Sequence, residues 1–253
     1  MSNLSDIGFP TPDEQAVNEM IMHVLELAKP IQCEQGFYLK FSDASGAEIY
    51  LQGNFDQELV GFNPHFAGKS RRKVGITQKI ERDSSELDGG FHAWANPSDS
   101  DVEASGEYPF IFDTPDFRLV EIENFPVLKD IQLTAFASND FQMFENEESY
   151  YASQEDETKF AAKSFIPSGL FSPEKTDENI DLNVVRPIGI FAGEIKEFAL
   201  KKNQLSGQEF YWLLVETLGG EVDIVVDPKF VTTEPQIGGI VSGQFWLSGR
   251  IND

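Results

Sequence analysis

The sequence predicts a mainly β protein, a β-rich α+β chain in which an N-terminal amphipathic helix precedes two small antiparallel β domains. Three observations predict this class. Apolar residues recur clearly at helical spacing only near the N-terminus. Most later segments alternate apolar and polar residues over short runs, and Gly, Pro, Asp and Ser separate those runs. A chain of 253 residues is long enough for one large or two small domains.

The helix is predicted in "TPDEQAVNEMIMHVLELAKP". Thr11 is the expected N-cap, Pro12 occupies the first helical position, and Glu14 follows three residues after the cap. Pro30 is expected to stop the helix. Its apolar face contains Val17, Met20, Ile21, Val24, Leu25 and Ala28.

The first domain is predicted over residues 1–166. Alternation on both sides of Asp43–Gly46 predicts a hairpin. Residues 140–165 fit one or two helical turns, and strand or loop remains open. Residues 167–187 are rich in Pro, Ser, Asn and charge, so we expect them to connect the two domains. Further strands are expected in "KVGITQKIE", "GGFHAWAN", "YPFIFDTPDFRLVEI" and "DIQLTAFAS".

The second domain is predicted over residues 188–253. It begins with a long strand, "IGIFAGEIKEFALKKN", and ends with the strand "GIVSGQFWLSGRI". Between them, "FYWLLVETLGGEVDIVVDP" predicts a hairpin with its turn at Leu218–Glu221, where two glycines tolerate positive φ. One face of the second arm should be buried and contains Val222, Ile224 and Val226. The other face should be mostly in water and contains Glu221, Asp223, Val225 and Asp227.

A curved first strand, a meander hairpin and a glycine-bearing last strand resemble the OB-fold, a small five-stranded Greek-key barrel. The resemblance implies a barrel in the C-terminal part, roughly residues 188–253. The sequence departs from the pattern, because it predicts four strands and no helix before the last one. The missing strand could come from the first domain; a plain antiparallel barrel or a sandwich edge is the alternative. As a whole, the chain resembles soluble bacterial proteins.

Residues 125–136 and 234–245 show a weak internal similarity. Both precede or enter a predicted closing strand, and Pro126, Leu128, Ile131 and Phe136 align with Pro235, Ile237, Ile240 and Phe245. Two related barrels in tandem would explain it. Chance matching of common strand residues is the other explanation.

The chain is strongly acidic, with 43 Asp and Glu against 19 Lys and Arg and a formal net charge of −24. Such a field repels phosphate backbones and anionic lipid, so we expect neither nucleic-acid nor membrane binding. It attracts cationic partners, although higher solubility is a simpler explanation. Cys33 is the single cysteine, and the N-terminus lacks the pattern of a secretory signal. We therefore expect a cytoplasmic protein.

Motifs for catalysis, cofactors and metals are missing from the sequence. It contains no G-x-S-x-G, no phosphate-binding loop and no dinucleotide-binding glycine pattern. Asp99, Asp101 and Glu103 alternate, but Ala104 and Phe110 stand where an EF-hand loop needs glycine and an acid. We expect no cofactor and no metal site.

The candidate ligand-binding residues are His92, Trp94 and Asp88. In an alternating strand His92 and Trp94 share one face, and a histidine, an aromatic ring and a carboxylate could line a pocket. The alternative is a half-buried strand whose histidine meets solvent.

The candidate partner-binding residues are Lys69, Arg71, Arg72 and Lys73. They open the segment 69–82, which holds six of the 19 basic residues and one acid. Alternation should place Arg71 and Lys73 on the face opposite Arg72. The alternative is pairing within the chain with one of two acidic tracts, residues 99–107 and 140–157.

These observations are compatible with three kinds of function. The first is a non-enzymatic cytosolic interaction protein whose acidic surface binds a cationic protein partner, as an inhibitor or immunity protein does for a cationic nuclease. The second is a small-ligand-binding protein or hydrolase with its pocket near His92 and Trp94. The third, single-stranded nucleic-acid binding, needs a basic groove that the acidic C-terminal part does not offer.

Overall fold

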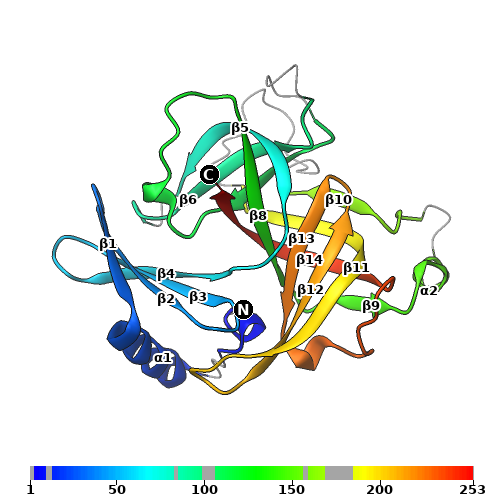
Figure 1. Ribbon diagram of the computed structural model, residues 1–253, viewed down its shortest axis with the longest axis horizontal. Helices are drawn as coiled ribbons and strands as arrows, with labels where there is room; N and C mark the ends of the chain where they lie inside the picture. Colours follow the sequence, from blue (N-terminus) through cyan, green and yellow to red (C-terminus); the bar gives the residue numbers. More distant parts are fainter. Residues whose placement is uncertain are drawn as a thin grey trace.

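The computed structural model describes residues 3–9, 13–82, 85–98, 106–155, 159–168 and 185–252. It contains a four-stranded antiparallel sheet and a ten-stranded mixed sheet, with one long helix beside the smaller sheet (Figure 1). The mainly β class predicted from the sequence is therefore confirmed.

The long helix is α1, Glu14–Leu27. Its N-cap is Asp13, whose side chain accepts a hydrogen bond from the Ala16 amide. The predicted cap Thr11 lies outside the described residues, and the helix starts later than expected because Asp13 satisfies the first free amides. Met20 and Val24 are buried on the predicted apolar face.

The smaller sheet follows α1 and has the order β1-β2-β3-β4. The predicted hairpin around Asp43–Gly46 is present as its two central strands. The two edge strands were not predicted, because both contain proline in short runs that lack clear alternation. The bounds are β1 Lys29–Cys33, β2 Gly36–Ser42, β3 Ala47–Gly53 and β4 Leu59–Phe66.

The larger sheet contains two similar series of strands. In each series three antiparallel neighbours are followed by a single 3-10 turn and a fourth strand. The first series is β5 Arg72–Glu81, β6 Gly89–Ala95, β7 Pro109–Asp113, η2 Phe117–Leu119 and β8 Val127–Ala137. The second is β11 Ile188–Lys202, β12 Glu209–Thr217, β13 Gly220–Val226, η4 Pro228–Phe230 and β14 Ile240–Asn252.

The pairings close two circuits of five strands each. One runs β5-β6-β7-β14-β8 and back to β5, and the other runs β11-β12-β13-β8-β14 and back to β11. Each series therefore uses the fourth strand of the other as its fifth, and each of these two contacts is parallel: β7 with β14 and β13 with β8. In the circuit of the C-terminal series the fifth strand is β8, which lies earlier in the chain.

Two of the four matched pairs of the weak internal similarity, Ile131 with Ile240 and Phe136 with Phe245, lie in the two fourth strands. Segment 125–136 leads into β8, and segment 234–245 leads into β14. These strands hold corresponding positions in the two circuits and pair with each other antiparallel, from Leu247 opposite Ala135 to Asn252 opposite Asp130. The similarity thus coincides with a repeated arrangement of strands. The domain division predicted at 167–187 stays a prediction, although the larger sheet joins strands from both sides of it.

Shorter elements complete the larger sheet. In the described residues of the ambiguous segment 140–165 lie one short strand, one short helix and the start of a second strand. Most of the connection 167–187 lies outside the described residues. The bounds are β9 Gln142–Phe144, α2 Glu147–Ala152 and β10 Ser164–Pro167.

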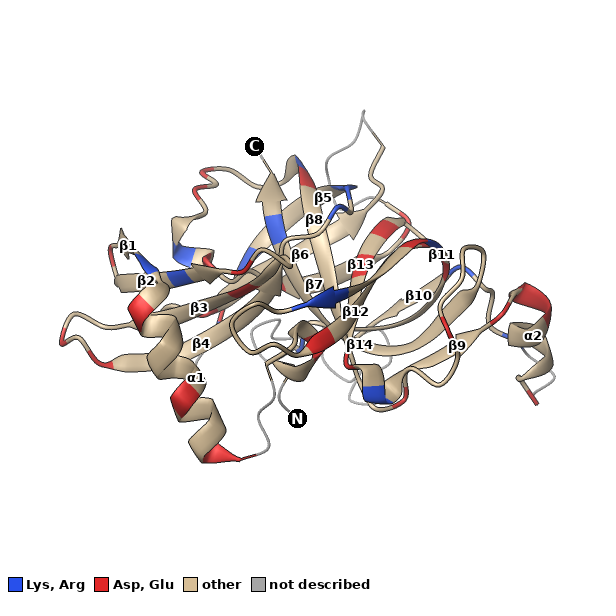
Figure 2. Ribbon diagram, turned by 60° about the horizontal axis from the view of Figure 1, so that its bottom comes forward, with Lys and Arg blue, Asp and Glu red and all other residues tan. Residues whose placement is uncertain are grey.

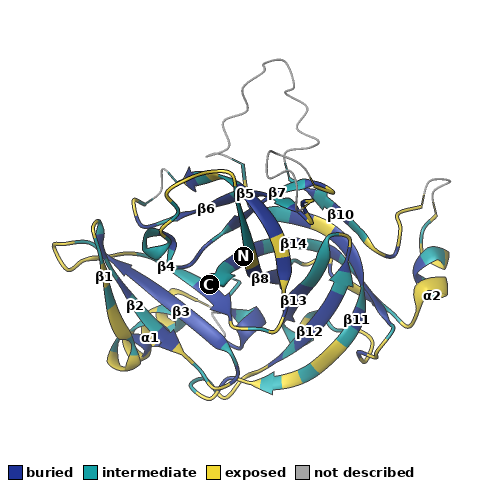
Figure 3. Cartoon of the chain, turned by 45° about the horizontal axis from the view of Figure 1, so that its top comes forward, coloured by how far each residue is buried: buried dark blue, intermediate teal, exposed yellow. Residues whose placement is uncertain are grey.

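Two main apolar cores lie on opposite faces of the larger sheet. Figure 3 colours each strand by its burial; β3, for example, is buried along its whole length. The inner core fills both circuits, and Val222, Ile224 and Val226 belong to it as predicted. The second core packs α1, residues 4–9 and the smaller sheet against the outer face of β12 and β13. The face of β13 predicted to lie in water is only partly so: Asp223 and Val225 are fully buried, whereas Glu221 and Asp227 are half-buried.

Candidate functional site

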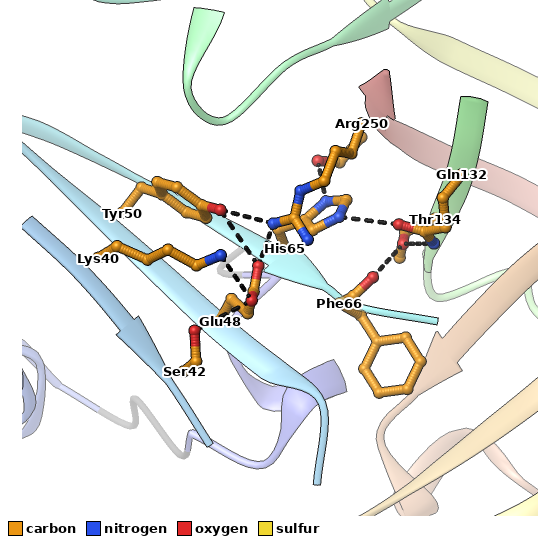
Figure 4. A network of polar contacts seen from close by, with 10 residues as sticks. Lys40, Ser42, Glu48, Tyr50, His65, Phe66, Gln132, Thr134 and Arg250 are labelled. Carbon is orange, nitrogen blue, oxygen red and sulfur yellow. Dashed lines mark hydrogen bonds and ion pairs between the residues drawn. The ribbon is translucent and has the colours of Figure 1, made fainter. Parts of the chain in front are cut away.

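A chain of buried polar side chains joins the smaller sheet to the larger one (Figure 4). His65, at the end of β4, is fully buried. Its Nδ1 lies 2.9 Å from Ser248 Oγ of β14, and its Nε2 lies 2.9 Å from Gln132 Oε1 of β8. Gln132 Nε2 in turn donates to Thr134 Oγ1 and to Asp223 Oδ2.

The contacts of His65 indicate which ring nitrogen carries the proton, and its burial determines its charge. An amide oxygen only accepts hydrogen bonds, so Nε2 must carry the proton that it donates to Gln132. Nδ1 then accepts the hydroxyl proton of Ser248. Burial lowers the pKa of His65 to about 3, so the ring is neutral at physiological pH.

Asp223 ends this chain and is completely buried, which overturns the expectation that it faces water. Its carboxylate accepts four hydrogen bonds, two of them from the backbone amides of Lys69 and Ser70, at 3.0 and 2.9 Å. Trp212 Nε1 and Gln132 Nε2 donate the other two, at 2.7 Å each. Four donors replace the water that the carboxylate loses, which makes its burial tolerable.

A second cluster lies beside His65 and centres on Glu48 of β3, whose side chain is 6% exposed. Lys40 Nζ and Ser42 Oγ lie 3.0 Å from Glu48 Oε1, and Arg250 Nη2 of β14 pairs with Oε2. Burial alone would raise the pKa of Glu48, but the charges of Arg250 and Lys40 bring it down to about 2. Arg250 also donates to Tyr50 Oη at 2.5 Å.

The chemistry of this network is limited by access. A serine hydroxyl on a neutral histidine is a nucleophile–base pair in geometry. Ser248 is 1% exposed and His65 is 0% exposed, so no substrate atom reaches either side chain. Each polar group described above finds its partners inside the protein. The network therefore attaches β4 to β8, β13 and β14, and we assign it no catalytic role.

Of the three candidate ligand residues, two lie side by side on one face of a strand and the third contacts the smaller sheet. His92 and Trp94 share the outer face of β6 and are half-buried, as alternation predicts. His92 Nδ1 lies 2.6 Å from Thr77 Oγ1, and burial lowers its pKa. Asp88 instead accepts hydrogen bonds from Gln52 Nε2 and Asn63 Nδ2 of the smaller sheet, at 2.5 and 2.7 Å.

The candidate basic residues differ in their exposure to solvent. Arg71 and Lys73 are exposed, and Arg72 is 2% exposed on the opposite face of β5, as predicted. The guanidinium of Arg72 donates to Tyr108 Oη at 3.0 Å and to the Gly220 carbonyl at 2.9 Å, so it cannot bind a partner. Lys69 Nζ forms an ion pair with Glu197 Oε2 at 2.5 Å. This contact is within the chain, but Glu197 belongs to neither of the two acidic tracts considered from the sequence.

Many other basic side chains take part in ion pairs within the chain. Besides Lys40, Lys69 and Arg250, these pairs involve Arg82, Arg118, Lys163, Lys196 and Lys229. By contrast, acidic residues of α1 and α2 are exposed, and the two helices lie at opposite ends of the molecule (Figure 2).

A shallow hollow lies on the outer face of α1, with a volume of about 580 Å³. It is lined by Glu14, Gln15, Asn18, Glu19, Met22 and His23. Met22 is 61% exposed, so the hollow combines carboxylates with an apolar side chain.

Comparisons with protein-family models, with curated proteins and with solved structures each found no match. Within the described ranges, no group of His, Cys, Asp and Glu is arranged to hold a metal ion. Asp99, Asp101 and Glu103 lie outside those ranges. No helix in the described part is long and apolar enough to cross a membrane.

No local sequence signal indicates the buried network. His65, Gln132, Asp223 and Ser248 lie on four different strands, far apart in sequence. One indirect signal was available, because polar residues interrupt strands whose other positions are almost all apolar, as in "LTAF" and "VDIVV". A strand covered on both faces tolerates such residues only where they find partners.

Proposed function

We propose that this chain is a non-enzymatic cytosolic binding protein whose acidic surface takes a cationic protein partner. The observation that supports the proposal is that basic and acidic side chains differ in how often they are paired within the chain. Many basic side chains pair within the chain, whereas acidic side chains of α1 and α2 stand in solvent. Part of the net charge of −24 is thus carried on the surface by these two helices, where it speeds encounter with a positively charged partner.

The outer face of α1 is the surface we propose for this partner. Its carboxylates Glu14 and Glu19 border a hollow that also exposes Met22. A lysine or arginine side chain of a partner fits this chemistry, because its methylene groups can cover Met22 while its charge meets the carboxylates. An inhibitor-like or immunity-like protein that neutralises a basic protein is the sharper form of this proposal.

We infer further that residues 188–253 form an OB-like barrel with β8 as its fifth strand. The support is the closed pairing of β8 with both β13 and β14. This inference does not add nucleic-acid binding, because the outer face of β12 and β13 is covered by the smaller sheet.

The test uses two variants with the same change of charge. Glu14→Gln/Glu19→Gln removes the two exposed carboxylates that border the hollow on α1, and Glu147→Gln/Glu148→Gln removes two from α2. Tagged protein is used for affinity capture from host lysate after nuclease treatment, and bound proteins are identified by mass spectrometry. We expect a basic partner at stoichiometric amount that elutes with salt, is weakened by the α1 variant and is retained by the α2 variant.

Two outcomes would overturn the proposal. If no basic protein is captured at stoichiometric amount by the unmodified chain, the acidic surface serves solubility alone. If a basic partner is captured equally well by both variants, the outer face of α1 is not its binding surface.

A further inference from the structure

β4 is an edge strand whose exposed half is apolar. The smaller sheet has the order β1-β2-β3-β4, so within the described part of the chain β4 pairs with another strand on one side alone. Its first two residues, Leu59 and Val60, are 42% and 45% exposed. Phe55, in the turn that leads into β4, is 70% exposed. Three large apolar side chains therefore meet solvent within one short stretch, which is a feature of interaction surfaces.

The opposite edge of the same sheet is built differently. β1 begins with Lys29 and Pro30, which are both exposed. Lysine and proline at an edge oppose the addition of a further strand. Residues 59–63 of β4 contain neither a charged residue nor a proline. The edge formed by β4 is thus the one that can accept another strand.

The free part of this edge is short. A β-bulge at Val60 interrupts the register with β3, so this residue has no partner there. From Asn63 onward the strand is used within the protein, because Asn63 Nδ2 donates to Asp88 Oδ1 at 2.7 Å and residues 64–66 are buried. The accessible stretch is therefore residues 59–62, which suits a short extended segment.

The charges beside this edge favour a basic occupant. Asp56 and Glu58 lie in the same turn as Phe55 and are exposed. Glu58 accepts a hydrogen bond from Asn54 Nδ2 at 3.1 Å, and among the described residues neither carboxylate pairs with a basic side chain. Together with the net charge of −24, these carboxylates repel a second copy of this chain and attract a cationic segment.

We propose that residues 59–62 bind an extended segment of a partner protein in which basic and apolar residues alternate. The segment adds to the smaller sheet as a fifth strand through backbone hydrogen bonds with β4. Its apolar side chains cover Phe55, Leu59 and Val60, and its basic side chains meet Asp56 and Glu58. The proposal extends the function proposed above, on which the choice of a basic occupant rests. The turn lies at the same end of the molecule as α1 (Figure 1).

The experiment titrates the folded full-length chain into short fluorescent peptides at physiological ionic strength and measures anisotropy. The first peptide alternates Lys and Val. In the second Ser replaces Val, and in the third Glu replaces Lys. In the fourth, two consecutive central amides of the Lys–Val peptide are methylated, which removes a backbone donor from each of its edges. We expect saturable binding of the first peptide and binding weaker by about ten-fold or more for the other three.

Variants of the chain locate the site. Leu59→Ser/Val60→Ser removes the exposed apolar side chains of β4, and Asp56→Asn/Glu58→Gln removes the two charges. Each should weaken binding of the Lys–Val peptide by about ten-fold. The matched control is Ile31→Ser, a half-buried position on the opposite edge strand, which should bind as the unmodified chain does. Circular dichroism confirms that each variant is folded.

Several outcomes would overturn the proposal. Equal binding of the Lys–Val and Lys–Ser peptides shows attraction by overall charge alone, and unchanged affinity in Leu59→Ser/Val60→Ser places the site elsewhere. A dimer of the unmodified chain in sedimentation that this variant dissociates assigns the edge to a second copy. Capture of a basic protein from lysate without Lys–Val peptide binding overturns the proposal for β4 and leaves the proposed function intact. Peptide binding without capture supports the β4 site and refutes the proposed function.

Discussion

The indole Nε1 of Trp212 donates a hydrogen bond of 2.7 Å to the carboxylate of Asp223, and both side chains are buried between the two sheets. The two residues lie on neighbouring strands, β12 and β13, on the face that the smaller sheet covers. Because the amides of Lys69 and Ser70 also donate to Asp223, this carboxylate holds the chain segment that leaves β4. Asp223 therefore links the two sheets through hydrogen bonds to both the larger sheet and the segment that follows the smaller one.

Replacement of Asp223 should therefore destabilise the protein strongly. In Asp223→Ala four buried donors lose their acceptor, and we expect a loss of about 3 to 5 kcal/mol in the free energy of unfolding. Urea unfolding followed by tryptophan fluorescence measures it. The control is Asp56→Ala, an exposed position where we expect a change within about 0.5 kcal/mol. Equal stability of both variants would contradict the assigned role.

Asp6 should make stability fall as pH rises. This carboxyl is buried near Asp227 and Lys229, and burial raises its pKa from 3.8 to about 8. The folded state therefore holds a proton that the unfolded state releases between these values. The stabilisation is complete below pH 3.8 and is lost as pH rises through about 8, at about 1.4 kcal/mol per pH unit in the steep part.

The variant Asp6→Asn tests this dependence, because its amide oxygen can still accept the hydrogen bond from the Asp227 amide. Unfolding measured between pH 5.5 and about 8 should show a smaller decline than in the unmodified chain. At the upper end the variant should be the more stable protein. Parallel stability curves for the two proteins would refute the assignment.

Glu48 should make the protein less stable as the pH falls, the opposite of the effect of Asp6. Its folded pKa of about 2 lies below the ordinary value of 4.5. The stabilisation is therefore present above pH 4.5 and is lost as pH falls towards 2. We expect Glu48→Gln to cost about 3 kcal/mol at neutral pH and much less near the acid limit. Glu58→Gln, at an exposed position, is the matched control in the same acid titration.

Alanine variants at two glycines with similar φ values should distinguish the stability cost of backbone strain from that of a steric clash. Gly219 and Gly207 have φ of +79° and +75°, but a Cβ atom at Gly219 would lie 2.6 Å from Tyr108 Oη, whereas Gly207 has open space. Gly207→Ala should cost about 1 kcal/mol from strain alone. Gly219→Ala should cost at least 1 kcal/mol more, because Tyr108 must move away from Leu218 and Arg72. Thermal unfolding of both variants compares them, and equal melting temperatures would contradict the clash.

The sequence by itself determined the local elements of this protein. The helix, the hairpin around Asp43–Gly46 and the strands of both series follow from periodicity and turn residues, which act over a few neighbours. The opposite faces of Arg71 and Arg72, and the inward direction of Val222, Ile224 and Val226, follow from the same period of two.

Only the tertiary structure decided which faces are covered and which polar residues meet. Alternation indicates that Val222 and Asp223 point in opposite directions, but it cannot show that a second sheet covers Asp223. Likewise, the two circuits share β8 and β14 through contacts between distant residues, such as Thr134 with Asp223 and Asp113 with Ser248. Burial is a property of the packed layers. His65 meets Gln132, Glu48 meets Arg250 and Asp223 meets the amides of Lys69 and Ser70 only because the two sheets pack together.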